Sequence, residues 1–316
     1  MLRMLKLRFE AEVTDAGTLP KFFGPTIRGA LGTMLRKIAC VTHTDECKSC
    51  LLHIQCPYAR FFEPYMPVDH PFSHRLSQMP RPFVLSVQPP EDKPVSLQQG
   101  SKLTFGITIW HNAEALLPYI VITAQKMLER GIGTGVKAKL MRVIAEHPDG
   151  DKTIFCSDDG LLSTALPTVS AEEVMTTKEA QIKRLTISFV TPTRIDIGGK
   201  LQNPITFKAL VRAANERARA IFWAYEKMET PWDGKRLIKL ATDVRTEDGE
   251  QKWVDLQRYS RRQNTRLKIG GIIGWQTFSG DALSEFIPML RLMEWLHVGK
   301  LTTMGLGKIT LQCFSQ

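Results

Sequence analysis

Apolar residues recur along the first half of the chain with the two periods that mark strands and helices. They alternate with charged residues from Leu5 to Val13, which predicts a strand with one buried face. From Gly24-Pro25 onward they recur every three to four residues, which predicts a helix whose buried stripe includes Met34 and Ile38. The same two patterns predict further strands at 83–87, 103–109 and 136–143, and a helix through 116–128.

The second half of the chain repeats this order of elements. Each half is predicted to run strand, helix, strands, helix, glycine-rich loop and closing strand, which is the βαββαβ order of the ferredoxin-like fold. We therefore expect an α+β protein with two tandem ferredoxin-like domains, residues 1–165 and 181–316, the first carrying a cysteine-rich insertion at about 40–95. The elements expected in the second half are strands at 185–189, 253–259, 266–278 and 308–314 and a helix at 207–222.

Asparagine, aspartate and proline predict where the helices begin. We expect Asn112 to cap the helix after the strand at 103–109, and Asn203-Pro204 to form a cap and first turn. Asp281 is the expected cap of the last helix. Proline lacks an N–H group, so Pro118 should kink or delay its helix and Pro288 should interrupt the last one.

Composition narrows the class of partner. The 316 residues are 43% hydrophobic and carry a formal net charge of +10, which favours a polyanionic partner over an acidic small molecule. No run approaches the ~18 consecutive apolar residues of a membrane span, and the N-terminus lacks a signal-peptide layout. We expect a cytoplasmic protein that does not contact a membrane.

A glycine-rich loop runs from His297 to Gly307, between the last helix and the closing strand. Glycine accepts φ > 0 and lets a phosphodiester approach the main chain, so the loop could offer N–H groups to an anion. It lacks the Lys-Ser/Thr ending of a nucleotide P-loop, so a polymer backbone fits better than a nucleotide, and a tight turn without a ligand is the alternative. The residues proposed to grip that backbone are Gly299, Thr302, Thr303, Gly305, Gly307 and Lys308, with Lys300 adding charge.

Four of the six cysteines lie close together in the sequence: Cys40, Cys47, Cys50 and Cys56. In a cytosolic chain such clustering favours metal ligation over disulfides. Four thiolates suit structural zinc, an iron–sulfur cluster also needs four, and free thiols are the remaining alternative. Four thiolates would leave no open position for a substrate, so we expect any metal here to be structural.

Several stretches of this chain occur together in one known family. They are Arg258-Tyr-Ser-Arg-Arg-Gln263, Gly270-Gly271-x-x-Gly274, Phe278-x-Gly-Asp281, Glu294–Lys300 with Thr302–Gly307, and, in the first half, Phe22–Gly32 and Cys56-Pro-Tyr58. In this combination the chain resembles the RAMP superfamily of CRISPR systems, and most closely its repeat-cleaving endoribonucleases. The four-cysteine cluster resembles one branch of that family.

The resemblance implies a CRISPR repeat-specific endoribonuclease that cuts precursor CRISPR RNA without a catalytic cofactor. The 2′-hydroxyl next to the cut would attack, leaving a 5′-hydroxyl and a 2′,3′-cyclic phosphate. Histidine suits the base and acid near neutral pH. Better-known members place a histidine, a tyrosine and a lysine on or just after the first helix, but this first helix has neither histidine nor tyrosine. The catalytic candidates are His43 and His297, with Lys300; alternatively, His43 is an exposed loop residue and His297 braces the loop.

The resemblance also implies contacts with the RNA partner, a repeat stem-loop. Arg258, Arg261 and Arg262 would contact phosphates and Tyr259 would stack on a base, although a charged strand edge is the alternative. A second hypothesis is a non-catalytic RAMP subunit that holds the guide RNA within an effector complex, beside other CRISPR subunits. A metal-dependent enzyme that uses the cysteines is a third.

Overall fold

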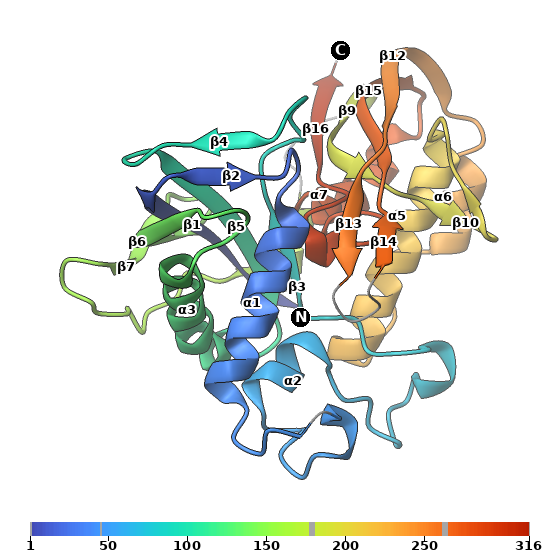
Figure 1. The fold of residues 1–316 in the computed structure, drawn as a ribbon. Helices are drawn as coiled ribbons and strands as arrows, with labels where there is room; N and C mark the ends of the chain where they lie inside the picture. Colours follow the sequence, from blue (N-terminus) through green and yellow to red (C-terminus); the bar gives the residue numbers. More distant parts are fainter. Residues whose placement is uncertain (1, 45, 177–180, 261–264, 316) are drawn as a thin grey trace. The chain divides into compact units, whose positions relative to one another are not determined.

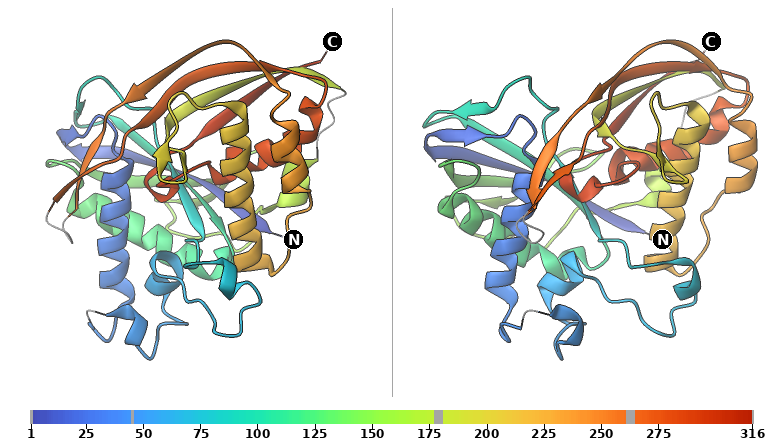
Figure 2. Two further views of the ribbon diagram at one scale, coloured as in Figure 1. Left: turned by 90° about the vertical axis from the view of Figure 1, so that its right-hand side faces the viewer. Right: turned by 45° about the vertical axis from the view of Figure 1, so that its right-hand side comes forward.

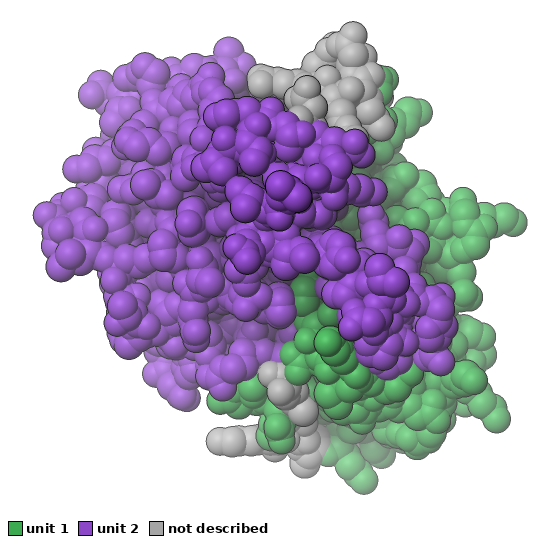
Figure 3. Space-filling view, turned by 90° about the horizontal axis from the view of Figure 1, so that it is seen from below, with its two compact units in different colours: residues 1, 170–316 green, residues 2–169 purple. Residues whose placement is uncertain are grey.

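The structure is a computed structural model that describes residues 2–44, 46–176, 181–260 and 265–315. The chain divides into two compact units (Figure 3). The first in chain order is Leu2–Val169, which is purple and labelled unit 2 in the figure. The second is Ser170–Gln316, with Met1, which is green and labelled unit 1. Among the described residues, no helix is both long enough and apolar enough to cross a bilayer.

The first unit is built on strand β1, whose alternating side chains were the clearest pattern in the sequence. β1 (Arg3–Asp15) lies between β5 and β6 in a sheet of order β3-β5-β1-β6-β7, and its neighbours run antiparallel to it (Figure 1). The remaining elements are β2 (Gly17–Leu19), α1 (Gly24–Ala39), η1 (Cys47–Ser49), α2 (Pro57–Phe62), η2 (Ser73–Arg75), β3 (Phe83–Ser86), β4 (Val95–Leu97), β5 (Lys102–Trp110), α3 (Ala113–Arg130), β6 (Lys137–Glu146), β7 (Lys152–Cys156) and β8 (Val169–Ser170).

The second unit is built on β9 (Ile182–Thr193) in the same way. β9 lies between β15 and β16, and the sheet order is β12-β15-β9-β16 (Figure 2). Its other elements are α4 (Ala171–Met175), β10 (Asp196–Ile197), β11 (Lys200–Leu201), α5 (Phe207–Ile221), the π-helical turn η3 (Phe222–Glu226), α6 (Gly234–Leu240), β12 (Arg245–Val254), β13 (Gln257–Ser260), β14 (Thr265–Lys268), β15 (Gly271–Ser279), η4 (Leu283–Phe286), α7 (Ile287–Leu296), η5 (Thr302–Met304) and β16 (Ile309–Ser315).

Both units share one strand order, and it confirms the predicted fold class. Each sheet has four core strands, which in chain order are β1, β3, β5 and β6 in the first unit and β9, β12, β15 and β16 in the second. In both, the first core strand lies between the third and the fourth, and the second lies outside the third. This is the sheet of a βαββαβ ferredoxin-like fold, with its two main helices on one face. The chain is therefore an α+β protein with two tandem ferredoxin-like units, and α2 and the cysteine-rich segment are inserted into the first.

Aromatic side chains fill the cores. In the first unit, Phe9 of β1 stacks on Phe105 of β5 with ring centroids 4.8 Å apart. In the second, Phe207 of α5 meets Phe278 of β15 at 4.8 Å and Phe286 at 4.9 Å. Burying one aromatic side chain removes ~150–250 Å² from water. The face of each sheet that carries these rings is therefore the face that the helices cover.

Each of the three predicted helix starts differs from the structure in at least one respect. The α3 helix begins directly after Asn112, as predicted, but Asn112 lies in the left-handed region and makes no side-chain capping hydrogen bond to the described residues, and the helix passes Pro118 without delay. The α5 helix starts after Thr206, not at Asn203-Pro204, because the Thr206 hydroxyl accepts a hydrogen bond from the Ala209 N–H at 3.2 Å.

The third error concerns the last helix. A short 3₁₀ turn, η4, precedes α7, and Pro288 lies in the first turn of α7, where its missing N–H costs no hydrogen bond. Pro288 therefore begins the helix and does not interrupt it. Asp281 lies before the turn and does not cap α7.

The Thr206 cap gives a test of the α5 start. Thr206→Ala removes the acceptor for the Ala209 N–H and should lower the free energy of unfolding by about 1 kcal/mol. Thr206→Ser keeps a hydroxyl at the same position and should lower it much less. Urea denaturation of both variants measures the difference, and equal losses would show that the hydroxyl does not cap the helix.

Candidate nucleic-acid interface

The glycine-rich loop of the second unit is held in an uncommon backbone conformation. It joins α7 to β16 and contains the turn η5. His297 (φ 57°) and Leu301 (φ 62°) both lie in the left-handed region, which L-residues with side chains rarely adopt. Such strained positions persist only where neighbouring groups hold them in place, and they cluster at functional sites.

Hydrogen bonds within the unit hold this loop. The Lys300 N–H donates to the Arg194 carbonyl at 2.9 Å, the Val298 N–H to Gly307 at 2.8 Å, and the Gly307 N–H to Pro192 at 3.1 Å. The N–H groups of Met304, Gly305 and Lys308 also donate within the unit. Much of the donor capacity that the sequence assigned to an anion is therefore used to shape the loop.

His297 is one of the groups that shape it. Its side chain is 1% exposed, and Nδ1 lies 3.0 Å from the Leu306 carbonyl oxygen across the loop. One residue earlier, the Leu296 carbonyl at the end of α7 accepts a hydrogen bond of 2.8 Å from Nε of Arg217 on α5. Burial lowers the pKa of Arg217 to about 10, so the guanidinium stays charged at neutral pH. His297 therefore braces the loop, which is the alternative to a catalytic role given in the sequence analysis.

The predicted RNA-gripping residues of the loop divide into two groups. Lys300 is exposed, with Nζ 3.4 Å from an Asp196 carboxylate oxygen, and Gly299, Thr303 and Lys308 are partly exposed. Thr302, Gly305 and Gly307 are buried, so in this conformation a ligand does not reach them. For these three, burial favours a supporting role in the loop over the predicted direct contact with RNA.

A β-hairpin extends the second sheet beyond β12 and β15 (Figure 1). Its strands, β13 and β14, pair Arg258 with Leu267 and Tyr259 with Arg266. The Arg258 side chain is half-buried, and its Nε has no hydrogen-bond partner among the residues that the structure describes. The other two arginines of the predicted phosphate-contacting run, Arg261 and Arg262, lie outside the described residues.

His43 belongs to the first unit, just beyond the end of α1. Its backbone has φ 52°, also in the left-handed region, and its side chain is exposed to solvent. His43 was predicted as a stand-in for the histidine that is missing from the first helix. Its exposure leaves the imidazole accessible to a ligand, in contrast to the buried ring of His297.

The four clustered cysteines surround one small cavity in the first unit. Cys40 ends α1, Cys47 begins η1, Cys50 follows η1 and Cys56 precedes α2, and all four line the same pocket of about 20 Å³. The Thr42 hydroxyl lies 3.9 Å from the sulfur of Cys40 and 3.5 Å from that of Cys50.

Neighbouring charges and hydrogen bonds shift the thiol pKa values in opposite directions. Burial raises the pKa of Cys47, and the negative charges of Glu63, Cys40 and Cys56 raise it further, against Arg36. For Cys40, burial acts to raise the pKa, but hydrogen bonds from His43, Thr42 and Arg36 outweigh it and leave the pKa below its usual value.

The cavity has the donor atoms of a metal site but not their arrangement. The donor set, four thiols around a space for one small group, is chemically suited to zinc. Among the side chains that the structure describes, however, no group of three or more His, Cys, Asp or Glu residues is arranged to hold a metal ion. The thiols would have to rotate toward the cavity to coordinate one.

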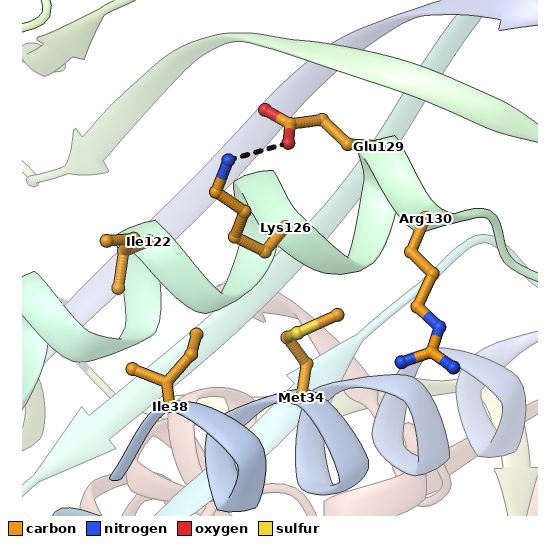
Figure 4. A pocket seen from close by; sticks show the side chains of 6 residues that line it. All are labelled: Met34, Ile38, Ile122, Lys126, Glu129 and Arg130. Atoms are coloured by element: carbon orange, nitrogen blue, oxygen red, sulfur yellow. Dashed lines mark hydrogen bonds and ion pairs between the residues drawn. The ribbon is translucent and has the colours of Figure 1, made fainter.

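The helices of the first unit leave a groove that the sequence did not predict. Met34 and Ile38 of α1 were predicted to belong to the buried stripe, but they are only half-buried. They line one side of the groove and face Ile122 of α3, and the groove has a volume of about 560 Å³ (Figure 4). Lys126 and Glu129 pair at 2.9 Å along its rim, and Arg130 lies at its end. Met34 and Ile38 fit the helical period of a buried stripe, and they are partly exposed only because α1 and α3 lie apart at this point.

Comparison with known proteins places both units in described families. The family model AF_1859_N, an N-terminal domain, matches residues 2–167, and the model for the CRISPR-associated endoribonuclease Cas6 matches residues 187–309. The second match contains the hairpin and the glycine-rich loop. No curated protein matches the chain in sequence.

Solved structures agree with the fold at low sequence identity. A Cas6 product complex is similar with a TM-score of 0.58 at 14% identity, over 98% of this chain and 100% of that chain. Thermus thermophilus Cas6 has a TM-score of 0.55 at 13% identity and 99% coverage of both chains. A partial Cas6-RT-Cas1–Cas2 complex has a TM-score of 0.58 at 12% identity, over 100% of this chain and 47% of that chain.

The chain belongs to the AF_1859_N family through its N-terminal domain, and its second unit matches the model for the CRISPR-associated endoribonuclease Cas6.

A matched pair of glycines tests whether the loop's geometry matters. Gly299 (φ +80°) and Gly199 (φ +83°) have the same backbone conformation, but a Cβ on Gly299 would meet the Arg194 carbonyl, whereas Gly199 faces open space. Gly199→Ala should cost about 1–2 kcal/mol of unfolding free energy. Gly299→Ala should cost clearly more and weaken RNA binding. Urea denaturation and filter binding measure both effects, and equal behaviour of the two variants would contradict this role of the loop.

Proposed function

We propose that this protein is a CRISPR repeat-specific endoribonuclease that cuts precursor CRISPR RNA without a catalytic metal. The 2′-hydroxyl beside the cut attacks the phosphate, and the products carry a 5′-hydroxyl and a 2′,3′-cyclic phosphate. The observation that carries the proposal is the Cas6 match over residues 187–309, the segment that includes the hairpin and the loop.

The reaction needs a base for the 2′-hydroxyl, an acid for the leaving 5′-oxygen and cations near the phosphorane. We assign the base to His43, because its imidazole is exposed just beyond α1. In the second unit, the exposed Lys300 is proposed to contact an RNA phosphate, with Thr303 and Lys308 as partly exposed donors in the same loop. Tyr259 and Arg258, with Arg261 and Arg262, are proposed to hold the repeat stem-loop through stacking and phosphate contacts.

Cleavage with EDTA present tests the mechanism. Wild-type protein should cut its host's repeat RNA once, and His43→Ala should slow the cut ~10²–10⁴-fold while RNA binding is kept. His74→Ala, which alters an exposed histidine of the same unit, is the matched control and should cut normally. Mapping of the product ends checks for the cyclic phosphate.

The same assay separates the alternatives. His297→Ala should weaken binding as well as cutting, because it releases the Leu306 contact within the loop. Undiminished cutting by His43→Ala would remove this residue from the mechanism. Tight binding without any cut by the wild type would instead favour a non-catalytic RAMP subunit that holds guide RNA, an alternative that the burial of His297 supports.

We also propose that Cys40, Cys47, Cys50 and Cys56 hold a structural zinc ion. The four thiols line one cavity whose size, about 20 Å³, suits a single ion better than an iron–sulfur cluster. The ion would tie the end of α1 to the start of α2, which are otherwise joined by a largely exposed segment.

Metal content tests the zinc proposal. Purified wild-type protein should contain about one zinc per chain by plasma mass spectrometry, and Cys47→Ser or Cys50→Ser should lose most of it. Cys156→Ser changes a cysteine outside the cluster, with similar partial exposure, and should keep the metal. The two cluster variants should also unfold at a lower temperature. Zinc-free wild-type protein with the same melting temperature would refute the proposal.

Other CRISPR subunits are proposed partners. A protein of similar fold forms part of the Cas6-RT-Cas1–Cas2 complex named above. We propose that this chain likewise associates with CRISPR effector subunits after cleavage.

A further inference from the structure

One face of the second sheet carries exposed aromatic side chains. α5 and α7 cover the other face, where Phe278, Leu185 and Phe189 are buried. Side chains alternate along a strand, so their neighbours in sequence point away from the helices. On that side Trp275 of β15 and Phe314 of β16 are each 40% exposed. Each ring offers an exposed flat apolar surface on which a planar group such as a nucleobase can stack.

The strand register fixes the distance between the two rings. Trp275 pairs with Ser188 of β9, and Phe314 pairs with Arg184 of the same strand. Four residues along β9, at ~3.4 Å each, and two strand spacings of ~4.8 Å place the two Cα atoms about 17 Å apart. The rings are therefore too far apart to pack on each other, and each is available to a separate planar group.

Small polar side chains occupy the surface between the rings. Thr277 is buried on this face and its hydroxyl pairs with that of Thr186 at 2.8 Å, whereas Ser188 is partly exposed and Thr310 and Gln312 are exposed. These groups donate and accept hydrogen bonds, as a ribose and its 2′-hydroxyl require.

Positive charge lies beside the aromatic residues. The Arg184 guanidinium stands 6.0 Å from the Phe314 ring centroid and also pairs with Glu247 at 2.9 Å. Lys252 of β12 pairs with Ile273, two residues from Trp275, and is exposed on the same face. Glu250 lies opposite Trp275, so the face is not uniformly basic. The net charge of the chain, +10, still favours a polyanion.

We propose that this face, defined by Trp275, Phe314, Arg184 and the polar side chains between them, binds a single-stranded segment of RNA. Bases stack on Trp275 and Phe314, while Arg184 and Lys252 contact the backbone. The proposal rests on the proposed function, because it gives the nuclease a second contact with the unpaired RNA that flanks its stem-loop. Stacking of this kind tolerates any base sequence.

Binding of a short oligouridylate, which forms no stem, tests the proposal on the full-length protein. Trp275→Leu and Phe314→Leu each remove a ring and should raise Kd about tenfold. Trp275→Phe retains a ring and should keep most of the affinity. Tyr119→Leu is the matched control, because Tyr119 is an aromatic residue of α3 in the other unit and is 39% exposed. All variants should keep the wild-type unfolding midpoint.

Two results would overturn the proposal. One is wild-type affinity for oligouridylate in both leucine variants. The other is a molar mass, measured by light scattering, that differs between the leucine variants and the wild type while their RNA affinity is the same. That result would make the face a contact between copies of the chain. Cleavage of the repeat stem-loop by the wild type, measured in parallel, tests the nuclease separately. A protein that binds oligouridylate through Trp275 but never cuts would keep this site and lose the proposed function.

Discussion

Antiparallel pairing on both edges of one strand in each unit is the constraint on which this structure depends. β1 is hydrogen-bonded to β5 and β6, and β9 to β15 and β16. With both edges occupied, the register of all three strands is fixed, and so is the face that receives the helices. The hairpin, the glycine-rich loop and the exposed aromatic residues of the second unit all take their positions from β9 or from the strands beside it.

The sequence predicted the fold well because its main signals are local. Alternation from Leu5 to Val13 and the helical stripe after Pro25 correspond to β1 and α1, and the repeated order of elements gave the fold class. Helix starts were harder to predict. Thr206 and Asn203 are both reasonable caps, and only the backbone decides that the hydroxyl of Thr206 reaches the Ala209 N–H. β12 was largely missed because its exposed, charged sequence buries almost nothing.

The candidate site was less predictable for a physical reason. Residue type reveals which chemistry is available, but exposure depends on long-range packing. His43 and His297 were equal candidates as residues, and the structure separates them by burial. In the loop, glycine content signalled a tight backbone, but the carbonyls that accept its N–H groups come from Pro192 and Arg194, about a hundred residues away in the sequence. No local pattern reports such partners.

The first unit has its own glycine-rich turn, after α3, and there the backbone is used differently. Thr134 exchanges two hydrogen bonds with Thr18 of β2, and a Cβ on Gly133 would collide with Leu19. The turn of the first unit is thus held by the added strand β2, and Gly133, Thr134 and Gly135 stay exposed. The loop of the second unit is held by the carbonyls of Pro192 and Arg194 and is largely buried, with Lys300 exposed. Equivalent turns in the two copies of one architecture are therefore anchored by different partners, so that a change to one anchor need not disturb the other.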